Sequence, residues 1–265
     1  MKMLRQPLNL LCILVSLGFL SGCQIGATRP PVVEHNGTPL PNVIALQQDF
    51  LLKPDVAERY LRVSELEAQA LALLGDEPLR LGSVGSAILE IYPASYTGHF
   101  VLEKFYRNLE STEAQQFHAA WLRHLRNSIT LDAKGTAEAP YRIFSINDAK
   151  TLLARQGLIE SGAIYQNSAE KPLTLTLLAR ENDQQPIRSM QFDLTPVLKP
   201  LNSDLSGEQA VQPNNPWPLL RELASSQNSA AQTSIGTFLA KQNRFDAAIS
   251  LSLIHISEPT RHTDI

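Results

Sequence analysis

The chain has 265 residues, of which 43% are hydrophobic and 18% charged, with 23 lysine and arginine residues, 26 aspartate and glutamate residues and two cysteines. This composition excludes a collagen-like, a disulfide-stapled or a wholly disordered chain, and the length allows one or two domains with their own cores. The chain is mildly acidic and lacks the excess positive charge that is typical of proteins that bind nucleic acid, so we expect no nucleic-acid partner.

Residues 1–23 are predicted to be a signal peptide with a lipid attachment site. Basic residues precede an apolar run over 8–20, and about 13 residues are too few to span a bilayer as a helix. The run ends in the letters LSGC at 20–23, which resemble the lipobox of bacterial lipoproteins. The resemblance implies cleavage before Cys23 and acylation of its thiol. The alternative is an ordinary secretory signal followed by an incidental cysteine.

The lipobox resemblance also implies a location in the bacterial cell envelope. The three acyl chains of a mature bacterial lipoprotein hold it on a membrane, so we expect Cys23 to anchor the chain without spanning the bilayer. In the enterobacterial sorting pattern an aspartate after the acylated cysteine favours the inner membrane. Gln24 stands at this position and predicts the periplasmic face of the outer membrane. Cys12 falls in the removed segment, so we expect neither a disulfide nor a cysteine metal site.

The first stretch of the mature chain is predicted to be extended. Residues 24–45 hold four prolines among small polar residues, and at roughly 3 Å per residue such a tether lifts a domain up to about 60 Å off a membrane. A domain of the α+β class is predicted to follow over 46–200. Its first long helix is predicted to start at Asp55, where Glu58 completes a capping box.

A helical hairpin is predicted over 95–109 and 112–129, with Thr112 capping the second helix. His118 falls within the apolar arc of that helix. It is the candidate for a catalytic residue, as a general base or a ligand, and the alternative is a hydrogen-bonded core histidine. His124 lies about 120° around the helix from His118, so the two side chains cannot share a metal ion.

The pattern changes to strands in the second half of this domain. Short strands are predicted over 141–144 and 158–165, with a helix between them that starts at Ser145. Leucine alternates with threonine over 173–177, and apolar alternates with polar over 187–194. This alternation predicts a small antiparallel sheet with a hairpin at its centre.

Some turn and cap residues of the middle domain resemble those of an uncharacterised bacterial secreted domain family over roughly 90–195. The resemblance is carried by Gly135-Thr136, Pro140, Asp148-Ala149, Gly157-Leu158 and Phe192-Asp193. It implies no activity. Gly135 and Thr136 are interpreted either as a ligand loop or as a turn.

Residues 201–216 are predicted to form a second linker, and 217–250 the start of an α-helical repeat. The spacing of a tetratricopeptide repeat, and of the related Sel-like repeat, is matched by Ile235-Gly236, Leu239, Asn243, Phe245 and Ala248. The resemblance implies a helix pair whose first helix lines a concave surface. Thr233, Thr237 and Lys241 are therefore the candidate partner-binding residues. The alternative is an unrelated amphipathic hairpin.

Residues 251–265 are predicted to be foreign to the protein. The letters LSLIHISEPTR at 251–261 resemble a sequencing adapter translated in frame, and the alternative is a native tail. On the first interpretation the repeat is truncated, and His255 and His262 take no part in any metal or catalytic argument.

The motifs of several common enzyme classes are missing from the sequence. It contains no phosphate-binding loop, no G-x-S-x-G elbow, no H-E-x-x-H and no dinucleotide-binding glycine pattern. We expect no cofactor and no metal, and we favour a lipid-anchored scaffold that binds envelope proteins or peptides through its helical repeat. The alternative is a periplasmic hydrolase or cell-wall-acting enzyme that uses His118. The oligomeric state is left open.

Overall fold

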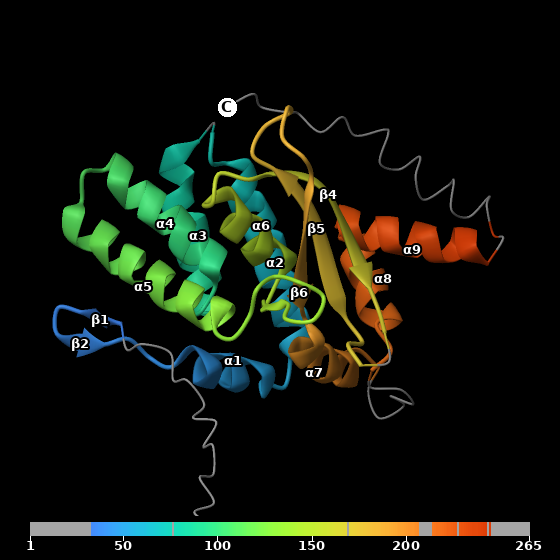
Figure 1. Cartoon of the computed structure of the whole chain (residues 1–265). Helices are drawn as coiled ribbons and strands as arrows, with labels where there is room; N and C mark the ends of the chain where they lie inside the picture. The colour runs from blue at the N-terminus through green and yellow to red at the C-terminus, as the bar shows by residue number, and fades with distance from the viewer. Residues whose placement is uncertain are drawn as a thin grey trace, which may run out of the picture.

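The computed structural model describes residues 33–75, 77–168, 170–206, 214–226, 228–242 and 244. Helices and strands mix in one chain, which confirms the predicted α+β class (Figure 1). In chain order the elements are β1 (Glu34–His35), β2 (Thr38–Pro39), α1 (Val43–Leu51), α2 (Val56–Ala72), the short 3-10 helix η1 (Pro78–Arg80), α3 (Leu81–Ile91), α4 (Tyr96–Asn108), α5 (Thr112–Thr130), β3 (Tyr141–Arg142), α6 (Ile146–Ala154), β4 (Ile159–Gln166), β5 (Thr174–Arg180), β6 (Arg188–Asp193), α7 (Thr195–Ser206), α8 (Trp217–Ser225) and α9 (Ser229–Lys241). The predicted signal peptide, the predicted second helix of the repeat and the predicted foreign tail lie outside the described residues.

Four strands form the main sheet in the order β3-β6-β5-β4. The predicted hairpin is confirmed as the antiparallel β5–β6 pair, in which Leu175 lies opposite Phe192 and Leu177 opposite Met190. β3 is shorter than the predicted strand and pairs with β6 in parallel. Leu175, Leu177 and Phe192 are fully buried on one face of the sheet, as the alternating pattern predicts.

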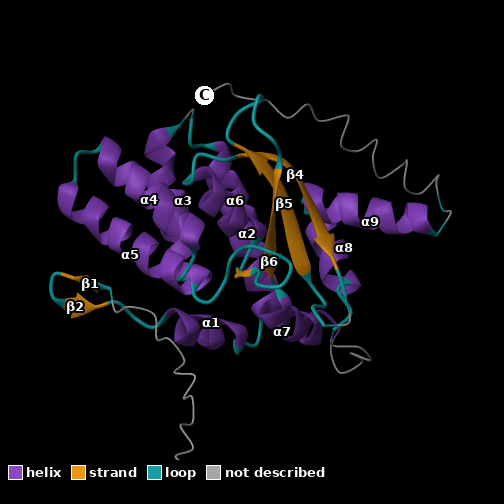
Figure 2. Cartoon of the chain, viewed as in Figure 1, coloured by secondary structure: helices purple, strands orange, loops and turns teal. Residues whose placement is uncertain are grey.

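The sheet lies between the helix-rich N-terminal half and the α8–α9 pair (Figure 2). α6 packs on β4 and β5, and α9 packs along β4. β4 is an edge strand, and the Ser234 hydroxyl of α9 accepts a hydrogen bond from the N–H of Tyr165 at 2.8 Å. A covered edge strand is protected against pairing with other chains.

The predicted helix α2 and the predicted α4–α5 hairpin are confirmed, but the capping box at the start of α2 is wrong. The Asp55 carboxylate makes no cap bond and accepts instead from the Arg59 guanidinium at 2.6 Å. Asp204 of α7 accepts the N–H of Ala57 at 2.8 Å. One of the free N–H groups at the start of α2 is thus satisfied by a carboxylate from a distant helix.

The predicted tether is wrong from residue 33 onward. The β1–β2 hairpin forms here, and its turn holds Asn36 and Gly37 in the left-handed conformation at φ 52° and 75°. Asn-Gly is the favoured dipeptide for a two-residue hairpin loop because both positions require positive φ. The segment is tied to α5, since Nε2 of His124 donates to the Pro41 carbonyl at 2.9 Å.

The predicted second linker is wrong over 201–206, where α7 continues. Pro200 lies inside this helix, and Leu198 and Leu201 on its buried face are almost fully excluded from water. A proline inside a helix removes one backbone hydrogen bond. The burial of this apolar face, which packs against α2, sustains the helix in spite of that loss.

One continuous cluster of buried apolar side chains runs through the described residues from α1 to α9. It joins Leu219 and Leu223 of α8 and Ala231 of α9 to the sheet and to α2. The predicted boundary between 46–200 and 217–250 therefore does not separate two cores in the described part. None of the described helices has the length and apolar composition needed to cross a membrane.

Candidate functional sites

Two of the three predicted partner-binding residues line a groove of about 510 Å³ beside α9, which we call the α9 groove. Ser234, Thr237, Phe238 and Lys241 border it from one helix face, because residues three and four apart lie on the same side of a helix. Thr233 is exposed and lies outside the groove, where its carbonyl accepts from the Thr237 hydroxyl at 2.8 Å. The structure thus brings Thr237 and Lys241 together and leaves Thr233 at their margin.

A polar ladder across three strands forms another part of the α9 groove. The buried Thr176 hydroxyl lies 3.1 Å from Oε1 of Gln166 and 3.0 Å from Oε1 of Gln191. A hydroxyl donates one proton only, so one of these amides presents its NH₂ group to the threonine. Each amide keeps further donor and acceptor positions, and both glutamines line the groove.

An aromatic pair and charged side chains complete the α9 groove. The rings of Trp217 and Phe238 have their centres 4.2 Å apart and are tilted by 41°. Lys171 and Lys241 bring positive charge to the lining, and Glu170 brings negative charge. Aromatic surface beside a few polar groups is typical of sites that bind protein segments and small ligands.

His118 pairs with a second histidine that the sequence analysis does not identify. Its Nδ1 lies 3.0 Å from Nδ1 of His99, and Nε2 of His99 lies 3.0 Å from the Pro93 carbonyl. A carbonyl only accepts, so Nε2 of His99 carries a proton, and neutral His99 then accepts at Nδ1 from His118. Nε2 of His118 is left as an acceptor. The His118 side chain lines a hollow of about 460 Å³ together with Tyr106 and Ser111.

Burial keeps both histidines neutral. It lowers the pKa of His99 to about 3 and the pKa of His118 to about 4, and the nearby Glu103 carboxylate offsets only part of the second shift. A base with a pKa of about 4 is poorly matched to proton transfer near neutral pH. The hydrogen bond of His118 goes to His99 and not to Ser111, which favours the interpretation of a packed, hydrogen-bonded histidine. Within the described ranges, no three His, Cys, Asp or Glu side chains gather to hold a metal ion.

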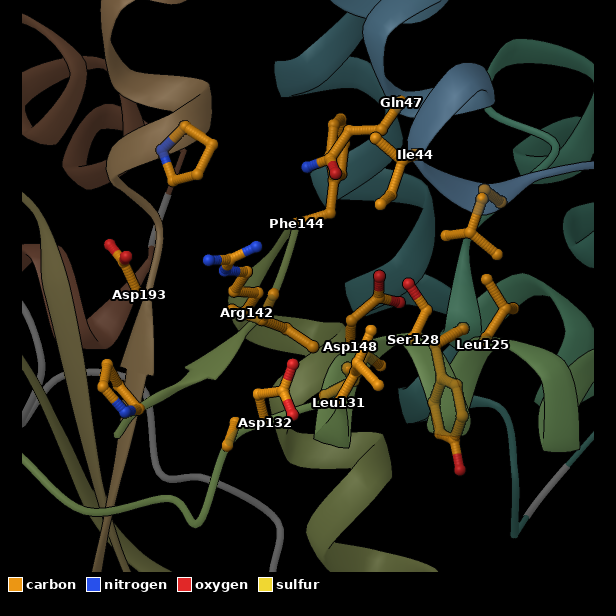
Figure 3. Close-up of a pocket in the computed structure, with 18 of the residues that line it drawn as sticks. Ile44, Gln47, Leu125, Ser128, Leu131, Asp132, Arg142, Phe144, Asp148 and Asp193 are labelled. Atoms are coloured by element: carbon orange, nitrogen blue, oxygen red, sulfur yellow. The ribbon is translucent and has the colours of Figure 1, made fainter. Parts of the chain in front are cut away.

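The sequence gives no signal for a further cavity, which lies beside α1. A cavity of about 610 Å³ opens between α1, the C-terminal end of α5 and the segment around β3 (Figure 3). α1 contributes Ile44 and Gln47 to its lining, and α5 contributes Leu125 and Ser128. Asp148, which is only 2% exposed, also lines the cavity. From the sequence, this residue stands out only as one of the turn and cap residues of the middle domain.

Asp148 belongs to a buried pair of carboxyl groups. Its partner is Glu67 of α2, whose two carboxyl oxygens accept from the hydroxyls of Ser95 at 2.7 Å and Ser145 at 2.6 Å. These serines are the N-caps of α4 and α6, and each hydroxyl also accepts an N–H from the first turn of its own helix. Asp148 accepts the N–H of Thr97 at 2.8 Å. One pair of side chains therefore ties α2, α4 and α6 together.

The carboxyl pair carries a single negative charge near neutral pH. Burial raises the pKa of Glu67 well above its usual range and raises the pKa of Asp148 to about 6, where hydrogen bonds from Thr97 limit the shift. Glu67 therefore stays protonated and donates to the Asp148 carboxylate. The N-terminal ends of α4 and α6 both meet this charge, and helix N-termini stabilise an anion. This network gives the pair a structural role.

Comparison with known proteins finds no match to the chain among protein-family models, curated proteins or solved structures. The resemblances to bacterial lipoproteins, to tetratricopeptide and Sel-like repeats and to an uncharacterised secreted domain family therefore stay predictions.

Proposed function

We propose that this chain is an outer-membrane lipoprotein, anchored through Cys23, whose periplasmic domain binds envelope proteins or peptides in the α9 groove. One observation supports the proposal most. Thr237 and Lys241, chosen from the repeat spacing alone, lie on the wall of a groove that also carries amide groups and an aromatic pair.

The chemistry of the α9 groove fits an extended protein segment. The N–H and C=O groups of a peptide backbone can pair with the side-chain amides of Gln166 and Gln191, which retain free donor and acceptor positions. An apolar side chain of the partner packs against Trp217, and its carboxylates are attracted to Lys241. Because α9 covers the edge of β4, we expect recognition through side chains rather than through an added strand.

Site-specific photocrosslinking tests binding in the groove. A photoreactive amino acid in place of Thr237 of the full-length protein should capture a defined envelope protein in intact cells. The same amino acid at Thr233, one turn away and outside the groove, serves as the matched control and should give about tenfold less adduct. Lys241→Glu should remove the Thr237 adduct. Equal adducts at both positions, or none at either, would contradict the proposal.

The lipid anchor has a separate test. Cys23→Ala removes the thiol that would carry the acyl chains, so the variant should no longer incorporate a labelled fatty acid and should leave the membrane fraction. The wild-type chain should be labelled and should sediment with the outer membrane. A variant that stays membrane-bound and labelled would show that the anchor lies elsewhere.

A periplasmic hydrolase is the second candidate, because His118 and Ser111 line the same hollow. A serine activated by a histidine base reacts with fluorophosphonates. Labelling of Ser111 that disappears in His118→Asn would establish this function. A chain that binds partners but does no acyl chemistry stays unlabelled.

A further inference from the structure

An apolar pocket of about 490 Å³, separate from the α9 groove, opens among α2, α4, α6 and the start of β4. Its walls are mainly aliphatic and aromatic, with contributions from Leu71, Leu74, Phe100, Leu153, Leu158 and Ile159. Ile159 is 58% exposed here, so the pocket leaves a large part of this apolar side chain open to water. Covering such surface with another apolar group is favourable by about 25 cal/mol per Å².

Positive charge gathers at the same pocket. The ammonium nitrogen of Lys104 and the guanidinium carbon of Arg155 each lie 5.7 Å from the centre of the Phe100 ring. Lys150, which also lines the pocket, is paired with Glu160 at 3.0 Å. Among the described residues, neither Lys104 nor Arg155 forms an ion pair with a carboxylate. Lys104 lines the pocket and Arg155 does not, so one lining lysine remains uncompensated beside the apolar walls.

We propose that this pocket binds a free fatty acid, with the acyl chain against the leucines and Ile159 and the carboxylate at Lys104. The volume falls within the range of about 300–1,000 Å³ that is usual for small-molecule sites. A neutral chain leaves the Lys104 ammonium unpaired, and a cationic amphiphile is repelled by it. A carboxylate gains a charge-assisted hydrogen bond from Lys104. The site shares no lining residue with the α9 groove, so fatty-acid binding can be tested independently of the proposed function.

Ligand competition tests the chemistry of the site. The full-length chain carrying Cys23→Ser, which has no acyl chain of its own, is titrated with a fluorescent fatty acid. The bound fluorophore is then displaced with dodecanoate, methyl dodecanoate or dodecylammonium. Dodecanoate should displace it at the lowest concentration, and the ester and the amine should each need about tenfold more. A methyl ester that competes as well as the acid would overturn the proposal, as would the absence of saturable binding.

Matched variants locate the site. Ile159→Glu places a negative charge, the same sign as that of the ligand, at the apolar wall and should abolish dodecanoate binding. Ile187 is similarly exposed (55%) but lies outside the pocket, so Ile187→Glu should bind dodecanoate as the wild type does. Lys104→Ala should weaken dodecanoate about tenfold and leave the methyl ester unchanged. Lys134→Ala, at an exposed lysine elsewhere, should change neither. If Ile159→Glu unfolds the chain, the comparison of Lys104→Ala with Lys134→Ala decides whether dodecanoate binds in this pocket. Unchanged affinity in Lys104→Ala would place the ligand elsewhere.

Discussion

Glu67→Ala should destabilise the chain by about 3 kcal/mol or more, the range found when one partner is removed from a buried polar or ionic pair. The substitution takes away the acceptors of the Ser95 and Ser145 hydroxyls and the acidic proton that faces Asp148. Two helix N-caps and one buried charge lose their partner together. Urea unfolding at neutral pH measures the loss.

Glu67→Gln is the matched control for the protonated state of Glu67. A glutamine is neutral, nearly the same size as the protonated acid, and keeps one oxygen acceptor and an N–H donor for Asp148. It should cost only about 1 kcal/mol. Glu65→Ala, at an exposed residue paired with Arg62, should change stability by less than about 0.5 kcal/mol. If glutamine were as damaging as alanine, Glu67 would have to be ionised in the folded chain.

The pH dependence of stability should separate two buried sites that act with opposite sign. The pKa of His99 is lowered from 6.5 to about 3, so the stability it contributes above pH 6.5 is lost as the pH falls. The pKa of Asp148 is raised from 3.8 to about 6, so its contribution is present at low pH and is lost as the pH rises through 6. Between about pH 7.5 and about pH 4.5, each group changes the free energy of unfolding by about 2–3 kcal/mol.

Two variants test the direction in which each group changes stability with pH. His99→Gln keeps a donor for the Pro93 carbonyl. On acidification, its free energy of unfolding should fall by about 2 kcal/mol less than that of the wild type. Asp148→Asn keeps an acceptor for the Thr97 N–H. Its free energy of unfolding should fall by about 2 kcal/mol more than that of the wild type on acidification. Urea unfolding of the three proteins at both pH values checks the prediction. The same dependence on pH in all three would mean that neither group titrates abnormally in the folded chain.

Elements with a clear local pattern could be predicted from the sequence, and elements whose stability depends on distant contacts could not. The apolar spacing predicts α2 and α5, and the alternation predicts β5 and β6, because each pattern repeats within one element. The helix α7 contains Pro200, which locally opposes a helix, and is held by burial against α2. The cap predicted at Thr112 is wrong, since the N-cap is Ser111 and its side chain makes no cap bond. The hairpin at Asn36-Gly37 has a recognisable turn, which the proline content of the segment obscures.

The same distinction applies to the sites. Thr237 and Lys241 share a helix face, so the spacing alone brings them to one wall of the α9 groove. His99 and His118 meet across the α4–α5 hairpin, 19 residues apart, and Glu67 receives the Ser145 hydroxyl from a residue 78 positions away. Tertiary packing creates these last two contacts, and no periodicity in a single sequence encodes them.

Hydrogen exchange with the bound partner tests the central claim most directly. The partner captured through Thr237 is added to the full-length protein, and amide exchange is compared with and without it. The α9 groove predicts slower exchange at the end of β4, over 164–168, and over 234–241 of α9, with the hollow of His118 unchanged. Protection that falls on the His118 hollow or on the large cavity beside α1, and leaves the groove unchanged, would contradict the account.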